Sequence, residues 1–469
     1  MTSRAEFYAT RWRRIQPARS KESFLNPDSR RNKIGLLGPF SFGNLGNAAL
    51  QETLVEHLNK RFPDAEFYGC CVDLSEPAKA RQIFPFPLNR QVPWTRKSRS
   101  VGPNRVRMDE SREEPRAICE WLKRTPPFSG VERRARTAWS KVKEVRQELA
   151  FCYEALRFAR EFRLLVVGLG GVFDEVWGGK WGDLYSYFRW AVLARIAGTP
   201  LVCLSVGVEE VTTRLAKFFC RSTLSLSAYR SFRDVESKQK VEAMGVTGEL
   251  HVFPDLAFAL ERVGGRGNPT DHRNLRAVGV SPMAYCDPRF WPIKNLSVYQ
   301  DYLKKLSSFV SWLLQDGYEV VLFATQIRMD SMAIEELKAL VLEQAPLGLH
   351  ARLSDAKLGT VDECLVLLSK LDTVVTSRLH GVILASLMST PVLAISPGGK
   401  IDSLMQDMGL TDYVLNIQQI ELPLLINRFR NLEANHEVVS RSIEGSVAKY
   451  RLASETQLDM VFQPGFVNL

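Results

Sequence analysis

The chain of 469 residues contains no run of about 18 uncharged apolar residues, the length that a membrane-spanning helix requires. The nearest approach, residues 191–208, is interrupted by Arg195 and by the Gly198-Thr199-Pro200 turn. The first residues also lack the apolar core of a secretory signal. They are rich in arginine and poor in acids, so we expect a basic, disordered leader over residues 1–32, with a mitochondrial transit peptide as the alternative.

Cysteine and histidine are too scattered to suggest a metal site. The 8 cysteines show no metal-ligand spacing: Cys70 and Cys71 are adjacent, and the others lie in apolar surroundings. The sequence also shows no cluster of His, Cys and carboxylate residues. We therefore expect reduced, mostly buried thiols, a cytoplasmic protein and no bound metal.

The positive charge of the chain, +10 in total, is concentrated in two segments. Residues 90–150 hold 16 Lys and Arg against 8 Asp and Glu, and residues 1–33 hold 9 against 3, which leaves the remaining chain near −4. Such segments bind membrane leaflets, nucleic acids or other polyanions, or simply form a solvated charged face. Because no aromatic stacking pattern accompanies the charges, we expect peripheral contact with the anionic inner face of a membrane rather than with a specific nucleic acid.

Short apolar strands alternate with amphipathic helices on both sides of a polar, glycine-rich stretch at residues 264–274. This alternation predicts an α/β fold with two parallel-sheet domains that face a central cleft. We place the first domain at residues 33–265, the second at 275–430, and a C-terminal helical segment that crosses back to the first domain at 431–469. Residues 85–150 break the pattern with Pro, Arg and Ser, and we expect a basic, partly disordered insertion there.

Two glycine-containing loops follow predicted strands of the first domain. They are Phe42-Gly43-Asn44-Leu45-Gly46-Asn47 and Gly168-Leu169-Gly170-Gly171. Glycine lets the backbone turn sharply and approach a ligand closely at the carboxyl edge of a parallel sheet. Neither loop is the dinucleotide-binding fingerprint, and no phosphate-binding lysine follows, so plain strand-to-helix turns are the alternative.

Basic side chains follow three further strands. Arg233 ends a strand that leads into a helix, Arg378 and His380 lie between a β-branched strand and an apolar helix, and Lys400 follows the next strand. In an open parallel sheet these positions converge where ligands bind, and a helix N-terminus adds a positive dipole end. A guanidinium suits bidentate binding of phosphate or carboxylate, so we expect a basic cleft for a small, strongly anionic ligand. The alternatives are that Arg233 pairs with Asp234, that Arg378 pairs with a structural carboxylate, and that His380 only caps its helix.

Taken in order, these motifs resemble the polysaccharide pyruvyl transferase family over about residues 33–412. The most distinctive are Phe232-Arg233-Asp234-Val235-Glu236-Ser237 and Ser377-Arg378-Leu379-His380-Gly381, with Phe253-Pro254-Asp255-Leu256-Ala257-Phe258 between them and Pro397-Gly398-Gly399-Lys400 after them. The resemblance implies two Rossmann-like domains similar to those of the GT-B glycosyltransferases. It also implies transfer of a pyruvyl group from phosphoenolpyruvate to a sugar, which forms a ketal and releases phosphate without a cofactor.

The resemblance further implies catalytic roles for His380, Arg378 and Arg233. The two arginines would bind the phosphate and carboxylate of phosphoenolpyruvate, and His380 would act as acid and base or as a phosphate ligand, since a near-neutral pKa suits a proton carrier. Around them we expect substrate-binding positions at Gly43, Asn44, Gly46, Asn47, Gly170, Gly171, Leu379 and Lys400. The acceptor would be a saccharide or a lipid-linked saccharide.

Two positions depart from the family pattern. Asn47 stands where the family usually has Asp, and Gly168-Leu169-Gly170-Gly171 replaces a run of three glycines. If the missing carboxylate orients an acceptor hydroxyl, the acceptor or the activity differs. Two other functions therefore stay open: a GT-B-like glycosyltransferase that uses a sugar nucleotide, and a non-catalytic family member in envelope glycan assembly.

Overall fold

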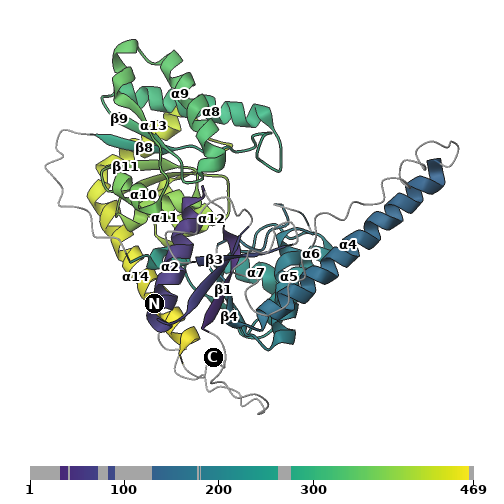
Figure 1. The fold of residues 1–469 in the computed structure, drawn as a ribbon. Helices are drawn as coiled ribbons and strands as arrows, with labels where there is room; N and C mark the ends of the chain where they lie inside the picture. Colours follow the sequence, from purple (N-terminus) through teal and green to yellow (C-terminus); the bar gives the residue numbers. More distant parts are fainter. Residues whose placement is uncertain are drawn as a thin grey trace.

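The computed structural model describes residues 32–40, 43–71, 83–89, 129–168, 170–176, 179, 181–261 and 276–463. The predicted leader, except for Asn32, most of the predicted insertion (residues 90–128) and the predicted linker at 264–274 lie outside the described residues. The described chain forms two α/β domains that meet along one side (Figure 1).

The N-terminal domain is built on a parallel sheet of 7 strands in the order β3-β2-β1-β4-β5-β6-β7. The strands are β1 (Lys33–Phe40), β2 (Glu66–Cys71), β3 (Ile83–Pro87), β4 (Phe162–Val167), β5 (Leu201–Val206), β6 (Tyr229–Phe232) and β7 (His251–Val252). The connecting helices are α2 (Leu45–Arg61), α4 (Ser129–Ala159), α5 (Asp183–Ala197), α6 (Arg214–Leu226) and α7 (Val235–Ala243), and a short 3-10 helix, η4 (Leu256–Ala259), follows β7.

The C-terminal domain repeats this plan with a parallel sheet of 6 strands in the order β10-β9-β8-β11-β12-β13. The strands are β8 (Ala277–Ser281), β9 (Glu319–Phe323), β10 (Leu353–Ala356), β11 (Thr373–Thr376), β12 (Val392–Ser396) and β13 (Val414–Asn416). Its helices are α8 (Leu296–Gln315), α9 (Ile327–Gln344), α10 (Val361–Leu368), α11 (Leu379–Leu387), α12 (Lys400–Asp407), α13 (Leu422–Ala434) and α14 (His436–Phe462).

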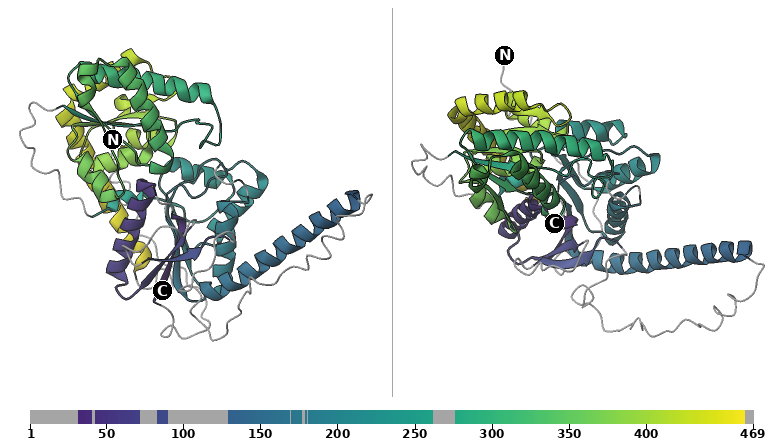
Figure 2. Two further views of the ribbon diagram at one scale, coloured as in Figure 1. Left: turned by 45° about the horizontal axis from the view of Figure 1, so that its top comes forward. Right: turned by 90° about the horizontal axis from the view of Figure 1, so that it is seen from above.

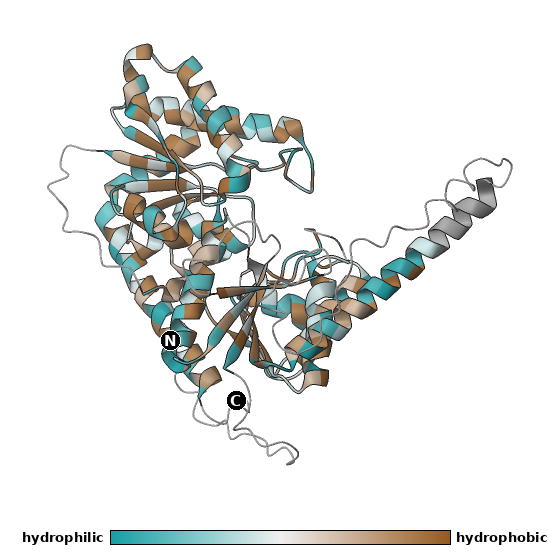
Figure 3. Cartoon of the chain, in the orientation of Figure 1, coloured by the Kyte–Doolittle hydropathy of each residue, from teal (hydrophilic) through white to brown (hydrophobic). Residues whose placement is uncertain are grey.

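Both sheets reverse their strand order at one point, between β1 and β4 in the first domain and between β8 and β11 in the second. Parallel sheets covered by helices on both faces consist of apolar strands, as the fully buried β5 and β12 show. Figure 3 shows hydrophobic residues, in brown, along many strands of both domains. Ligands of such folds bind outside the carboxyl ends of the strands at the reversal point. A ligand site is therefore expected at the loops that follow β1, β4 and β11.

Both ends of the insertion predicted at about residues 85–150 belong to regular elements of the fold. Residues 85–87 belong to β3, which pairs in parallel with β2 and extends the sheet. Residues 129–150 belong to the single helix α4, whose C-terminal part packs into the core through Phe151 and Phe158. The prolines of β3 argue against a strand in the sequence. Pro85 is tolerated because β3 lies at an edge of the described sheet, where its missing N–H costs little.

Helix α14 returns from the C-terminal domain to the N-terminal one. The buried Gln457 accepts a hydrogen bond from Ser205 Oγ (2.9 Å) and donates one to Ser231 Oγ (2.5 Å). Tyr450 packs on Phe258 with ring centroids 4.7 Å apart. Among the helices that the structure describes, none has the length and apolar character needed to cross a bilayer.

Candidate functional site

The loop after β1 joins the two domains directly. The backbone N–H of Leu45 donates to Thr325 O (2.8 Å), and that of Ile327 donates to Gly43 O (2.5 Å). Asn44 forms an isolated bridge with Gln326 between these bonds, and its side chain caps α2 by accepting from the Asn47 N–H (3.1 Å). Gly43 and Asn44 thus hold the N-terminus of α2 against the C-terminal domain.

The first turn of α2 packs directly on His380 in α11. A Cβ on Gly46 would lie within 2.5 Å of the His380 Cβ and closer still to its Cγ and Nδ1. Only glycine therefore lets the imidazole occupy its place between the domains. The sequence predicted both residues, and the structure brings them into contact.

His380 is the centre of the site by its burial and by its charged neighbours. Its side chain is only 15% exposed, and its Nε2 lies 4.0 Å from Asp255 Oδ2 without a hydrogen-bond partner among the described residues. Burial is the main cause that lowers the pKa of His380 to about 4; Asp255 opposes this shift, and the positive charges of Arg233, Lys400 and Arg378 add to it. The imidazole is thus neutral near pH 7, with both a carboxylate and three cations around it.

Arg233 lies beside His380 and is almost fully buried, with 5% of its side chain exposed. Its Nη2 donates to Glu209 Oε1 at 3.0 Å, and its Nη1 lies 3.5 Å from Asp255 Oδ2. Two glycines let the guanidinium fit: a Cβ on Gly207 would lie 2.7 Å from its Cζ, and one on Gly171 3.6 Å from its Nη2. Asp255 therefore stands between Arg233 and His380 and faces both.

Lys400 closes the site from the C-terminal domain through an ion pair with Glu209 of the N-terminal domain. Burial between the two domains lowers the pKa of Lys400, and the positive charge of Arg233 lowers it further. Burial alone would raise the pKa of Glu209, but Lys400 and Arg233 hold it below its ordinary value. Burial also raises the pKa of the nearby Asp174.

Arg378 is held in a fixed orientation by a buried carboxylate on α9. Its Nε donates to Asp330 Oδ2 (2.8 Å) and its Nη2 to Asp330 Oδ1 (2.6 Å), while Asp330 has no exposed surface. The Cζ atom of this guanidinium lies over the Trp291 ring, 5.9 Å from its centroid. The structural carboxylate that the sequence left open as an alternative is therefore present, and among the described residues Nη1 remains without a hydrogen bond.

Of the remaining predicted positions, Gly170 and Leu379 lie near the site, and Gly43 lies at the contact between the domains. Gly170, which has φ +83°, brings its Cα near Asn47, since a Cβ there would lie 3.7 Å from Asn47 Oδ1. Leu379 is the first residue of α11, whose N-terminus carries no side-chain cap in the part of the chain that the structure describes. Gly43 lies apart from this group, at the domain contact.

Acidic side chains accompany each of the predicted cations, so the expected basic cleft also contains carboxylates. Glu209, Asp255 and Asp330 were not among the predicted site residues, although Asp255 lies in one of the recognised motifs. Glu209 follows β5 just as the predicted residues follow their strands, so the same rule could have found it. Asp330 lies on a helix and gives no local signal, since only the fold pairs it with Arg378.

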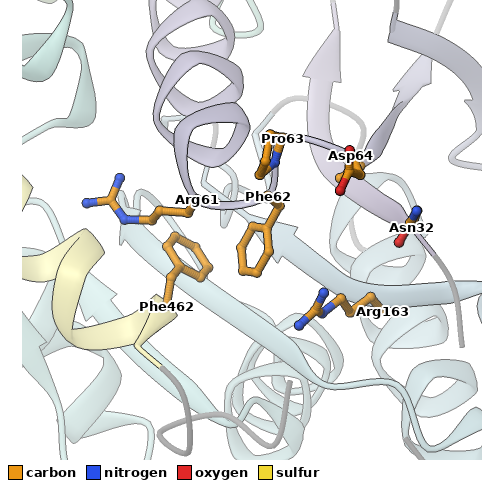
Figure 4. A pocket seen from close by; sticks show the side chains of 8 residues that line it. Asn32, Arg61, Phe62, Pro63, Asp64, Arg163 and Phe462 are labelled. Atoms are coloured by element: carbon orange, nitrogen blue, oxygen red, sulfur yellow. The ribbon is translucent and has the colours of Figure 1, made fainter. Parts of the chain in front are cut away.

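A separate hollow of about 390 Å³ lies at the amino ends of the strands of the N-terminal sheet, near the starts of β1 and β4 and away from the candidate site. Figure 4 shows Phe62 and Phe462 facing each other there, with Arg61 and Arg163 beside them. None of the candidate residues lines it. Within the described residues, no group of three or more His, Cys, Asp and Glu side chains has an arrangement that could hold a metal ion.

The polysaccharide pyruvyl transferase family profile matches residues 44–399, which include every candidate residue except Gly43 and Lys400 at the two ends. The chain belongs to the polysaccharide pyruvyl transferase family. Family membership places it among transferases of polysaccharide biosynthesis and implies a saccharide acceptor. The amylovoran biosynthesis protein AmsJ of Erwinia amylovora is 23% identical over 295 residues, which cover 59% of this chain and 69% of AmsJ.

Similar solved structures support the fold alone. A UDP-GlcNAc 2-epimerase from Neisseria meningitidis, bound to UDP-GlcNAc, has a TM-score of 0.51 at 10% identity and covers 91% of this chain and 100% of its own. MnaA from S. aureus, solved with UDP, has a TM-score of 0.52 at 11% identity and covers 92% of this chain and 95% of its own. The family member described here therefore has the GT-B-like arrangement of two Rossmann-like domains.

Proposed function

We propose that this pyruvyl transferase takes its pyruvyl group from phosphoenolpyruvate and transfers it to two hydroxyls of a sugar, forming a ketal and releasing phosphate. The observation that carries the proposal is His380 Nε2, a buried nitrogen without a hydrogen-bond partner among the described residues, in a side chain that feels the charges of Arg233, Lys400 and Arg378. A neutral base with three cations near it suits a substrate that brings both negative charge and a proton-transfer step.

Phosphoenolpyruvate presents a phosphate and a carboxylate, and the site offers cations from both domains for them. In the proposal, the phosphate replaces Glu209 as the partner of Lys400 and Arg233. The Nη1 of Arg378, which has no hydrogen bond among the described residues, binds the carboxylate. The uncapped N-terminus of α11 adds backbone N–H donors beside them. These same groups stabilise the negative charge that develops on the departing phosphate.

The proton balance assigns His380 a shuttle role. The first sugar hydroxyl adds to the central carbon of phosphoenolpyruvate, and its proton passes through His380 Nε2 to the methylene carbon, which becomes a methyl group. The bond between the central carbon and the phosphate oxygen then breaks, the second hydroxyl adds, and its proton leaves with the phosphate. Asp255, 4.0 Å from Nε2, stabilises the transient imidazolium.

The acceptor would approach from the side of the α2 N-terminus. Asn47 lies in the first turn of α2 and beside Gly170, close to the Gly46 contact with His380. An amide can accept and donate hydrogen bonds but cannot remove a proton, so Asn47 would position a sugar hydroxyl and leave proton removal to His380.

A thermal-shift experiment tests the donor assignment. A ligand that binds the folded state raises the melting temperature by linkage. Phosphoenolpyruvate should stabilise wild type more than inorganic phosphate, UDP or GDP does, and Arg233→Ala and Arg378→Ala should lose this shift. Arg430→Ala, a half-exposed arginine at the α13 surface, is the matched control and should keep it. Stabilisation by UDP or GDP alone would instead favour a glycosyltransferase.

A further inference from the structure

The outer part of helix α4 carries an apolar stripe that the proposed function does not use. Five large side chains on it are exposed by 59–74%, namely Trp139, Val142, Val145, Leu149 and Tyr153. They follow one another at intervals of three and four residues, so they lie on one face of the helix over about 21 Å.

This stripe points away from the body of the protein. The residues that anchor α4 to the N-terminal domain are Phe151, Ala155 and Phe158, which lie on a different face of the helix and near its C-terminal end. Figures 1 and 2 show the rest of α4 projecting from both domains in every view. Among the described residues, the stripe is therefore a face without a packing partner.

Basic residues accompany the stripe. Residues 129–146 contain six Lys and Arg against two Asp and Glu. Lys141, Lys143 and Arg146 are all exposed, whereas Glu148 is turned toward the body and pairs with Arg189 (2.5 Å). A helix with Trp, Leu and Val on one face and Lys and Arg at its margins is typical of helices that lie in the interface of an anionic bilayer.

We infer that α4 docks the protein on an anionic membrane surface, with the stripe in the headgroup boundary and the basic residues on the lipid phosphates. Trp139 and Tyr153 mark the two ends of the stripe, and such amphipathic rings prefer the level of the headgroups. A coiled coil with a second copy fits less well, because Arg146 occupies a seam position between Val142 and Leu149. The long side chain of Arg146 can instead extend its charge out of the stripe to the lipid phosphates. The inference does not depend on the proposed donor.

Sedimentation of the full-length protein with vesicles tests this docking. Wild type should bind vesicles of phosphatidylcholine and phosphatidylglycerol, and should bind pure phosphatidylcholine vesicles about tenfold less. Replacing three stripe residues with glutamine should lower the partition coefficient at least about tenfold. The variant carries Trp139→Gln, Val142→Gln and Leu149→Gln.

Two controls separate the stripe from general hydrophobicity and general charge. The first replaces three equally exposed apolar residues elsewhere and should bind like wild type: Leu347→Gln, Val438→Gln and Leu452→Gln. Lys141→Glu with Lys143→Glu should also lose binding, whereas Lys304→Glu with Lys370→Glu should keep it, since both pairs are exposed. Equal binding by wild type and the stripe variant would overturn the inference. The inference would also be overturned if wild type formed a dimer and did not bind vesicles, and if the stripe variant did not form that dimer.

Discussion

Gly46 and His380 come from different domains and lie in contact, with no room for a Cβ between them. The glycine belongs to the first turn of α2, and the histidine to the first turn of α11. Their contact makes the position of the imidazole depend on how the two domains meet. The site is therefore assembled by domain packing rather than by either domain alone.

Gly46→Ala tests this dependence. The added methyl group would push His380 or the domains apart, and a displacement of about 1 Å at a reacting group is enough to cost roughly a hundredfold in rate. We expect phosphoenolpyruvate-dependent transfer to fall by at least that factor. Gly445→Ala is the control, because a Cβ there meets nothing within 4 Å, and it should leave transfer unchanged. A fully active Gly46→Ala protein would contradict the account.

Asp330→Asn tests whether the buried carboxylate positions Arg378. An amide keeps the shape but loses the charge and one acceptor of the two hydrogen bonds, so the guanidinium should lose its fixed orientation. We expect the KM for phosphoenolpyruvate to rise roughly tenfold with a smaller change in kcat. Glu148→Gln, which weakens the Arg189 ion pair far from the site, should leave KM unchanged. A change in melting temperature without a change in KM would reduce Asp330 to a structural role.

Glu209→Gln tests whether this carboxylate competes with the substrate anion. Glu209 occupies both Lys400 and Arg233, so removing its charge should free them and remove repulsion toward phosphate. Phosphoenolpyruvate should then bind more tightly, by roughly a factor of five to ten. Calorimetric titration of both proteins measures this, and weaker binding by the variant would show that Glu209 supports the site instead.

Gln457→Ala tests the return of α14 to the first domain. The substitution leaves the buried hydroxyls of Ser205 and Ser231 without their shared partner and opens a cavity. We expect a loss of about 2–4 kcal/mol in the free energy of unfolding, measured by urea denaturation. The exposed Thr456→Ala is the neighbouring control and should cost less than about 1 kcal/mol.

The sequence predicted those parts of the molecule that are encoded locally. Arg233, Arg378 and Lys400 were found because each follows an apolar strand and precedes a helix, a pattern visible within a few residues. Asp330 was missed because it lies 48 positions from Arg378 and meets it only in the folded chain. The short edge strands β10 and β13 were missed as well, since edge strands of three or four residues give little periodic signal.

We propose above all that the buried, neutral His380 takes part in the chemistry of a bound anion. The pKa of His380 lies near 4, below its ordinary 6.5, and phosphoenolpyruvate bound beside it would raise this pKa. Binding should therefore take up a proton between the two pKa values, and affinity should rise as the pH falls through that window.

Calorimetric titration with phosphoenolpyruvate at pH 6, in two buffers of different ionisation enthalpy, measures this proton uptake most directly. On binding phosphoenolpyruvate, wild type should gain as much as about one proton more than His380→Gln does. Comparing the two proteins cancels the protons that the ligand itself gains or loses. Equal proton uptake by the two proteins, or no binding of phosphoenolpyruvate by wild type, would contradict the account.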